Sequence, residues 1–198
     1  MSIQTQSVPE RRKSAARYAL CGLVGSAAGA VIGFSIGWTI GIAMPGWQGL
    51  YIFLMAGYFL AGAGVGTTLG ITAGKRRIFL VALASASGFT IAFLLSMLGS
   101  RGGTITQGII LGGFAGATLG LLLRGWKTAG FLALAGAIAC AIISPIQTAL
   151  RTAAYQNPQT TLIVILEVSG PFISLAILGA VLGTVFGYLE NRLIDVKR

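Results

Sequence analysis

Long stretches of this chain contain no charged residue. Four of them lack Asp, Glu, Lys and Arg entirely: residues 18–74, 78–100, 102–123 and 128–150. A fifth, residues 160–189, is interrupted only by Glu167. A membrane-spanning helix needs about 20 apolar residues at about 1.5 Å each, so each of the shorter stretches fits one span and the longest fits two. Transmembrane strands are excluded, because they would show short alternating segments where this chain has continuous apolar runs.

The longest stretch divides between Met44 and Gly49, where Pro45, Gly46 and Trp47 are typical of a turn at a membrane surface. The sequence therefore predicts an all-α fold, a bundle of six transmembrane helices. A basic segment at residues 1–17 precedes this membrane domain at 18–189, and a short tail at 190–198 follows it. The expected helices are residues 18–43, 50–73, 78–98, 104–123, 128–149 and 161–189.

Composition supports this assignment. Hydrophobic residues make up 55% of the 198 residues, and a further 30 are glycine. Charged residues make up 9%, against about 25% in an average soluble domain. Too few polar groups remain to cover a soluble surface, and the hydrophobicity is too high for a disordered chain.

The basic residues indicate an orientation. An even number of spans places both termini on one side, and most Lys and Arg residues then lie on that side: Arg11, Arg12, Lys13, Arg17, Lys75, Arg76, Arg77, Arg124, Lys127, Arg192, Lys197 and Arg198. Only Arg101 and Arg151 lie on the other side. The positive-inside rule therefore predicts cytoplasmic termini in a cell membrane, plasma or inner. The partner implied by the net charge of +10 is the lipid bilayer and not nucleic acid, since the charge is spread over short segments with no continuous basic face.

Glycine recurs at every fourth position in four of the predicted helices. The series are Gly25, Gly29, Gly33, Gly37 and Gly41; Gly62, Gly66, Gly70 and Gly74; Gly108, Gly112, Gly116 and Gly120; and Gly179, Gly183 and Gly187. This step keeps the glycines on one stripe of each helix, where two backbones can approach closely. We expect a tight bundle of the first, second, fourth and sixth helices. The alternative is that one stripe faces outward and joins another copy or another membrane subunit.

The residues that most enzymes use are missing. The chain has no histidine, and its carboxylates are Glu10, Glu167, Glu190 and Asp195. Paired catalytic acids, triads and dyads are excluded, as are metal or haem sites built on histidine or clustered cysteine. We expect no catalytic residues, no cofactor and no bound metal.

Polar and helix-breaking residues gather at one depth of the last two predicted helices. They are Ser144, Pro145 and Gln147 in the fifth helix, and Glu167, Ser169, Gly170 and Pro171 in the sixth. Proline removes the hydrogen bond to the carbonyl four residues earlier, which for Pro171 belongs to Glu167. A carboxylate, a freed carbonyl and a hydroxyl together predict a substrate or ion site. The alternative is a shorter sixth span that leaves Glu167 at the interface, paired with Arg151 or capping the helix.

Two functions follow from these features. The first is a membrane subunit of a transport system, with an outward-facing polar pocket between the fifth and sixth helices. Because no ATP-binding motif is present, energy would come from a separate ATPase or a gradient. The second is a structural or assembly subunit that docks larger membrane proteins through its glycine stripes. The two differ in whether water reaches Glu167 from outside.

Overall fold

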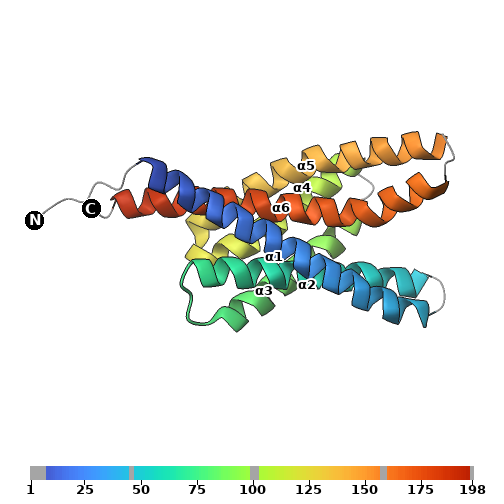
Figure 1. The fold of residues 1–198 in the computed structure, drawn as a ribbon, viewed down its shortest axis with the longest axis horizontal. Helices are drawn as coiled ribbons and strands as arrows, with labels where there is room; N and C mark the ends of the chain where they lie inside the picture. Colours follow the sequence, from blue (N-terminus) through green and yellow to red (C-terminus); the bar gives the residue numbers. More distant parts are fainter. Residues whose placement is uncertain (1–7, 45–46, 99–102, 157–159, 197–198) are drawn as a thin grey trace, which may run out of the picture.

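The chain folds into six long α-helices and their short connections (Figure 1). The computed structural model describes residues 8–44, 47–98, 103–156 and 160–196. The helices are α1 (Val8–Ile42), α2 (Trp47–Thr72), α3 (Ile78–Leu98), α4 (Gly103–Arg124), α5 (Trp126–Gln156) and α6 (Thr160–Val196). Each contains a segment long and apolar enough to cross a membrane. The prediction of an all-helical chain with six such helices is therefore confirmed.

Helix ends differ from the sequence-based bounds where polar residues precede or follow an apolar run. The bounds of α3 are those predicted, whereas α1 begins at Val8, ten residues before the expected 18. Likewise α5 continues to Gln156 and α6 to Val196. A helix does not have to end where its apolar run ends, because Arg, Lys, Glu and Ala are good helix formers in water. Much of the expected N-terminal segment and tail is thus a continuation of α1 and α6.

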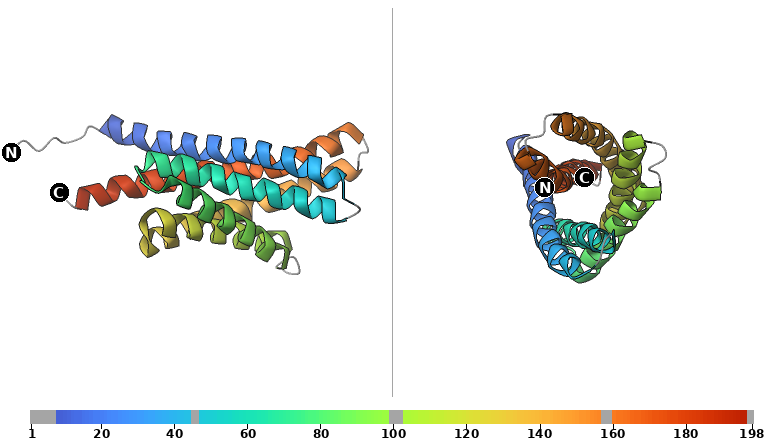
Figure 2. Two further views of the ribbon diagram at one scale, coloured as in Figure 1. Left: turned by 90° about the horizontal axis from the view of Figure 1, so that it is seen from below. Right: turned by 90° about the vertical axis from the view of Figure 1, so that its right-hand side faces the viewer.

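The helices form a ring in chain order. Each packs mainly on the helices before and after it, and α6 returns to pack on α1, as the end-on view in Figure 2 shows. The start of α1 and the end of α6 lie at the same end of the bundle, here called the terminal end. The end of α1, the start of α2, the end of α5 and the start of α6 lie at the other end, here called the distal end. The α2–α3 and α4–α5 turns face the terminal end.

Close packing between α1 and α2 depends on glycine. A Cβ atom added at Gly25 would lie 2.5 Å from the carbonyl oxygen of Gly64, and one at Gly33 would lie 2.9 Å from the Cα of Gly57. No side chain fits at such distances, so glycine permits this separation of the two helix axes. Gly64 is also in contact at this interface, although it lies outside the predicted series.

The stripes of α2, α4 and α6 each face the next helix around the ring. A Cβ at Gly66 would lie 2.7 Å from the Cβ of Ser85 on α3, and one at Gly120 would lie 2.6 Å from the Cα of Ala129 on α5. A Cβ at Gly187 would lie 3.1 Å from the Cα of Ala15 on α1. The remaining predicted packing glycines also face neighbouring helices. A Cβ at Gly70 would be at ordinary contact distance from its neighbour, whereas a Cβ would be too close to its neighbours at Gly29, Gly37, Gly62, Gly112, Gly116, Gly179 and Gly183.

The expected bundle of the first, second, fourth and sixth helices is wrong for α4. This helix packs on α5 and α3 and scarcely touches α2 or α6. The connection from α4 to α5 is the single residue Gly125, at φ 90°, and this short turn makes the two helices antiparallel neighbours. The face of α5 that receives α4 contains Gly136, directly opposite Gly112.

Gly74 ends α2 and takes no part in packing. Its φ of 65° is in the left-handed region, and no atom lies within 4 Å of where its Cβ would be. Its N–H donates to the carbonyl of Ile71 at 3.0 Å, and the N–H of Lys75 donates to that of Gly70 at 2.9 Å. This is the hydrogen-bond pattern of a Schellman motif, in which glycine is favoured at the left-handed position. The fourth glycine of that series is therefore a helix terminator.

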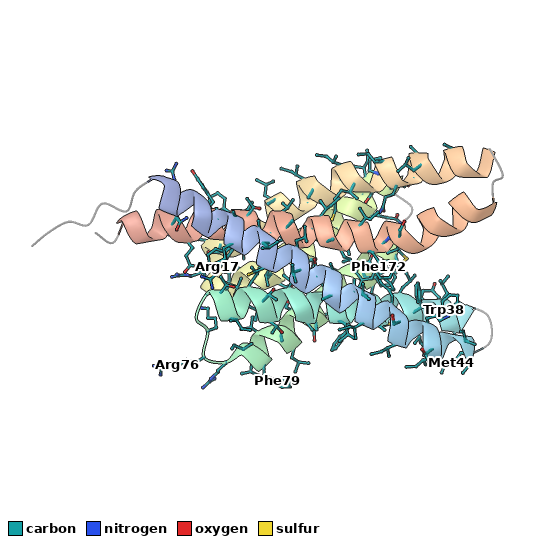
Figure 3. All side chains as sticks on the ribbon, viewed as in Figure 1. Arg17, Trp38, Met44, Arg76, Phe79 and Phe172 are labelled. Carbon is teal, nitrogen blue, oxygen red and sulfur yellow. The ribbon has the colours of Figure 1, made fainter. Side chains whose placement is uncertain are left out.

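The bundle is apolar inside and outside. Phe34, Phe89 and Phe186 are among the largest fully buried side chains of the core. On the outer surface Trp126 is 82% exposed and Phe79 is 77% exposed, and Phe79 extends away from the bundle in Figure 3. Soluble monomers rarely expose such large apolar surfaces, so this exterior fits a multi-pass membrane protein.

Ser85 provides a test of the α2–α3 contact. It is fully buried, and its Oγ has no hydrogen-bond partner among the described residues. A buried hydroxyl without a partner costs about 1–3 kcal/mol, so we expect Ser85→Ala to leave thermal stability in detergent unchanged or raised. Ser26 is equally buried but donates to the carbonyl of Leu23 at 3.1 Å, so Ser26→Ala should lower stability by about 0.5–1.5 kcal/mol. Equal destabilisation by the two variants would contradict this reading of Ser85.

Candidate functional site

A cavity of about 220 Å³ lies in the distal half of the bundle. Its wall comes from five helices: the beginning of α2, the end of α3, the beginning of α4, the second half of α5 and the turn of α6 that contains Pro171. On one side the wall is aromatic, where Tyr58 and Phe93 stack with ring centroids 4.5 Å apart. The cavity is thus enclosed by most of the ring, whereas the sequence predicted a pocket between the fifth and sixth helices only.

The rest of the wall is rich in uncharged polar side chains. They are Ser96, Thr104, Gln107, Ser144, Gln147, Thr148 and Ser174. At roughly 30 Å³ for each water molecule, the cavity has the volume of about seven waters. It could accommodate a small solute held by hydroxyl and amide groups.

Gln147 joins α5 to α6 at this cavity. Its Nε2 donates to the carbonyl of Gly170 at 2.5 Å and also to the Oγ of Ser174. A side-chain amide nitrogen has two protons, and both are used here. Gln147 therefore fixes the position of the α6 turn around Pro171 relative to α5.

Gln107 and Ser144 differ from Gln147 in their hydrogen bonding. Both line the cavity, yet neither side chain forms a hydrogen bond within the part of the chain that the structure describes. Polar groups away from bulk water are normally paired, with protein or with ordered water. These two side chains are therefore among those in the wall that could bind a ligand without disturbing the fold.

The residues predicted for the site are divided between two faces. Ser144, Gln147 and Pro171 line the distal cavity. Ser169 and Gly170 line a second, smaller and more apolar pocket of about 160 Å³ between α5 and α6, which Gln147 also borders. Pro145 is next to Ser144, within the continuous helix α5. Glu167 belongs to α6, but the side chains of Glu167 and Arg151 lie outside the described residues.

Sequence reasoning missed several polar residues of the wall, above all Gln107. The signal that could have identified it was its place in an otherwise apolar predicted span, since polar residues inside membrane helices are costly. Its proximity to Ser144 depends on the packing of α4 against α5. A Cβ at Gly108, one residue after Gln107, would lie 2.7 Å from the Ser144 Oγ.

A second polar cluster joins four helices at the terminal end. Glu190 of α6 forms an ion pair with Arg124 of α4. The hydroxyl of Tyr18 on α1 lies 3.2 Å from the Glu190 Oε2 and 3.3 Å from the carbonyl oxygen of Thr72 on α2. Because α4 and α6 otherwise scarcely touch, this cluster links them across the ring at the end opposite the cavity.

Comparison with known proteins adds no assignment. The chain matches no family model, no curated protein and no solved structure.

Proposed function

We propose that this multi-pass membrane protein binds a small polar solute in the distal cavity, as the membrane subunit of a transport system. The observation that carries the proposal is the polar wall of that cavity inside an otherwise apolar bundle. Unpaired polar groups are expensive in a membrane interior, where no bulk water can satisfy them. Amide and hydroxyl groups left unpaired by the fold, as in Gln107 and Ser144, are therefore expected to meet a solute or water.

Two prolines support a binding role at this depth. Pro145 and Pro171 both lie inside continuous helices beside the cavity, and each frees a backbone carbonyl one turn earlier. Many transporters place their binding sites at such interrupted helices. Glu167, one turn before Pro171, would supply the negative charge for a cation or for a positively charged group of the solute.

The proposed orientation places the distal end outside the cell and the terminal end in the cytoplasm. Lys75, Arg76, Arg77, Arg124 and Lys127 all belong to the terminal end of the bundle. This arrangement satisfies the positive-inside rule and makes the distal cavity an outward-facing site. A separate ATPase or an ion gradient would provide the energy.

The alternative function is that of a structural or assembly subunit. It would require glycine stripes that are free to dock other proteins. In the described structure the stripes of α1, α2, α4 and α6 face other helices of this same chain. Their use inside the ring favours the solute-binding proposal over docking through glycine.

Binding can be tested without knowing the solute in advance. Purified protein would be screened for thermal stabilisation by classes of small solutes: amino acids, polyols, nucleosides, vitamins and inorganic cations. A ligand present at about a hundredfold its Kd stabilises by about 2.7 kcal/mol, so we expect at least one class to raise the Tm by several degrees.

The variant Gln107→Leu tests whether a solute found in this screen binds in the distal cavity. It removes an amide from the cavity wall without breaking a bond of the fold, so the unliganded Tm should stay near that of the wild type. The solute should then be needed at tenfold higher concentration or more, about 1.4 kcal/mol of binding free energy. Gln48→Leu, the same change at an exposed position near the start of α2, should bind normally. The proposal fails if no class stabilises the protein, or if both variants respond like the wild type.

A further inference from the structure

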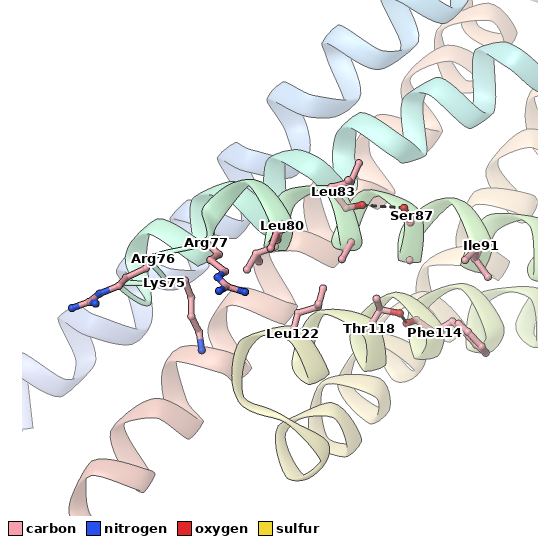
Figure 4. A pocket seen from close by; sticks show the side chains of 13 residues that line it. Lys75, Arg76, Arg77, Leu80, Leu83, Ser87, Ile91, Phe114, Thr118 and Leu122 are labelled. Carbon is pink, nitrogen blue, oxygen red and sulfur yellow. Dashed lines mark hydrogen bonds between the residues drawn. The ribbon is translucent and has the colours of Figure 1, made fainter.

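A long apolar groove runs between α3 and α4 on the outer surface of the bundle (Figure 4). Its volume is about 870 Å³. Leu80 and Ile91 mark its two ends on α3, and Phe114 and Leu122 form the opposite wall on α4. The groove begins at the terminal end and ends near the middle of the membrane-spanning segments.

Hydroxyl groups in the groove are already paired within their own helices. The Oγ of Ser87 donates to the carbonyl of Leu83 at 3.0 Å, and the Oγ1 of Thr118 donates to that of Phe114 at 2.9 Å. The groove therefore presents an apolar surface despite containing these two residues. This surface suits a hydrocarbon chain better than a polar ligand.

Three consecutive cations lie at the terminal end of the groove. Lys75, Arg76 and Arg77 all border it, and in Figure 4 Lys75 and Arg77 extend toward α4 while Arg76 extends away. None of the three forms an ion pair with an acid in the described part of the chain. The first residue of α3, Ile78, follows directly, so the unpaired N–H groups of a helix N-terminus add positive potential at the same place.

The length of the groove matches one leaflet of a bilayer. From Leu80 to Ile91 the helix advances about 16 Å at 1.5 Å per residue, close to half of a hydrocarbon core of about 30 Å. A cationic end at the membrane surface and an apolar channel of leaflet depth match a phosphate headgroup joined to an acyl chain. Basic pockets between membrane helices are known to bind anionic headgroups.

We propose that this groove is a binding site for an anionic glycerophospholipid from the leaflet at the terminal end. The phosphate lies against Lys75 and Arg77, and one acyl chain lies between α3 and α4. The site is separate from the distal cavity. It requires that the helices lie in a membrane, but it does not depend on solute binding.

The test is native mass spectrometry of the purified full-length protein in detergent, titrated with dioleoylphosphatidylglycerol or dioleoylphosphatidylcholine. The two lipids share their acyl chains, so a difference between them reports the headgroup. We expect the anionic lipid to bind at least tenfold more tightly, with one site of highest affinity. In the double variant Lys75→Gln/Arg77→Gln its affinity should fall by roughly twenty-five-fold, because each cation contributes a factor of about five.

Two controls make the assignment specific. Lys127→Gln/Arg192→Gln removes the same charge from the terminal end outside the groove, and it should leave the high-affinity site intact. Ser87→Trp places a large side chain in the apolar part of the groove and should weaken lipid binding at least tenfold with the cations still present. Inorganic phosphate at the same concentration should not displace the lipid, because it lacks the acyl chain.

Four lipid-binding results would overturn the proposal. They are equal binding of the two lipids, unchanged affinity in Lys75→Gln/Arg77→Gln, an equal loss in the control double variant, and displacement by inorganic phosphate. If Ser87→Trp instead dissociates a dimer of the chain, the groove is a contact between copies and the proposal is wrong.

Discussion

Gly116→Leu is expected to lower the free energy of unfolding by about 3 kcal/mol or more, the largest stability effect that we predict. A Cβ at Gly116 would lie 2.6 Å from the carbonyl carbon of Leu132 and 3.0 Å from the backbone nitrogen of Ala133. Both atoms belong to the backbone of α5 and cannot move aside as a side chain would. The two helices would have to separate along the whole α4–α5 contact, which is among the closest in the ring.

A matched control is available on α5. Gly130 is helical and exposed, and no atom lies within 4 Å of where its Cβ would be. Gly130→Leu should therefore be neutral or slightly stabilising, because leucine has a higher helix propensity than glycine. Thermal unfolding of both variants in the same detergent measures the difference. Equal melting temperatures would show that α4 does not pack on α5 through its glycines.

Glu167→Gln is expected to have the largest effect on function. Glu167 is the only acid within residues 18–189, and it lies one turn before Pro171, whose ring borders the distal cavity. If its carboxylate attracts a cationic group, the substitution keeps the shape and removes the charge. Solute accumulation in cells that lack the wild-type chain and produce the variant should fall at least tenfold, about 1.4 kcal/mol. Expression and thermal stability should remain near the wild-type values.

The measurement compares metabolites taken up by a deletion strain that carries either the wild-type or the Glu167→Gln chain. Glu190→Gln serves as the control, since it removes a carboxylate from the terminal end. After correction for the amount of folded protein, Glu190→Gln should restore uptake. Full restoration by Glu167→Gln would remove Glu167 from the site and leave only an interfacial role, where an exposed ion pair contributes about 0–1 kcal/mol.

The number of helices could be predicted from the sequence because, Glu167 apart, charged residues occur only between the long apolar stretches or at their ends. Which helix packs against which could not be predicted. In a soluble protein the apolar face of a helix marks the core, but here exposed residues such as Phe79 are as apolar as buried residues such as Phe89. Glycine stripes identify the faces in close contact but not the partner. Gly112 gives no sign that it lies opposite Gly136 on α5.

Some residues of the candidate site could be predicted from the sequence, and others could not. Ser144, Gln147 and Pro171 were identified because polar residues and prolines are unusual inside apolar helices. Ser169 and Gly170 belong to the same sequence cluster, but the helical turn directs them to the more apolar pocket between α5 and α6. Gln107 reaches the cavity from a different helix, and no local pattern connects it with Ser144. Only the packing of the ring brings these residues together.

If the distal cavity is hydrated and open to the outside, a cysteine in its wall should react with a reagent that cannot cross the membrane. Ser144→Cys would be made in a Cys21→Ala/Cys140→Ala background and exposed in intact cells to a small, membrane-impermeant methanethiosulfonate cation. Ser85→Cys, at the dry contact between α2 and α3, is the control. We expect the reagent to modify the cysteine at 144 from outside, whereas the cysteine at 85 should react only after denaturation. If the cysteine at 144 reacts only after denaturation, or only from the cytoplasmic side, the outward-facing polar site is contradicted.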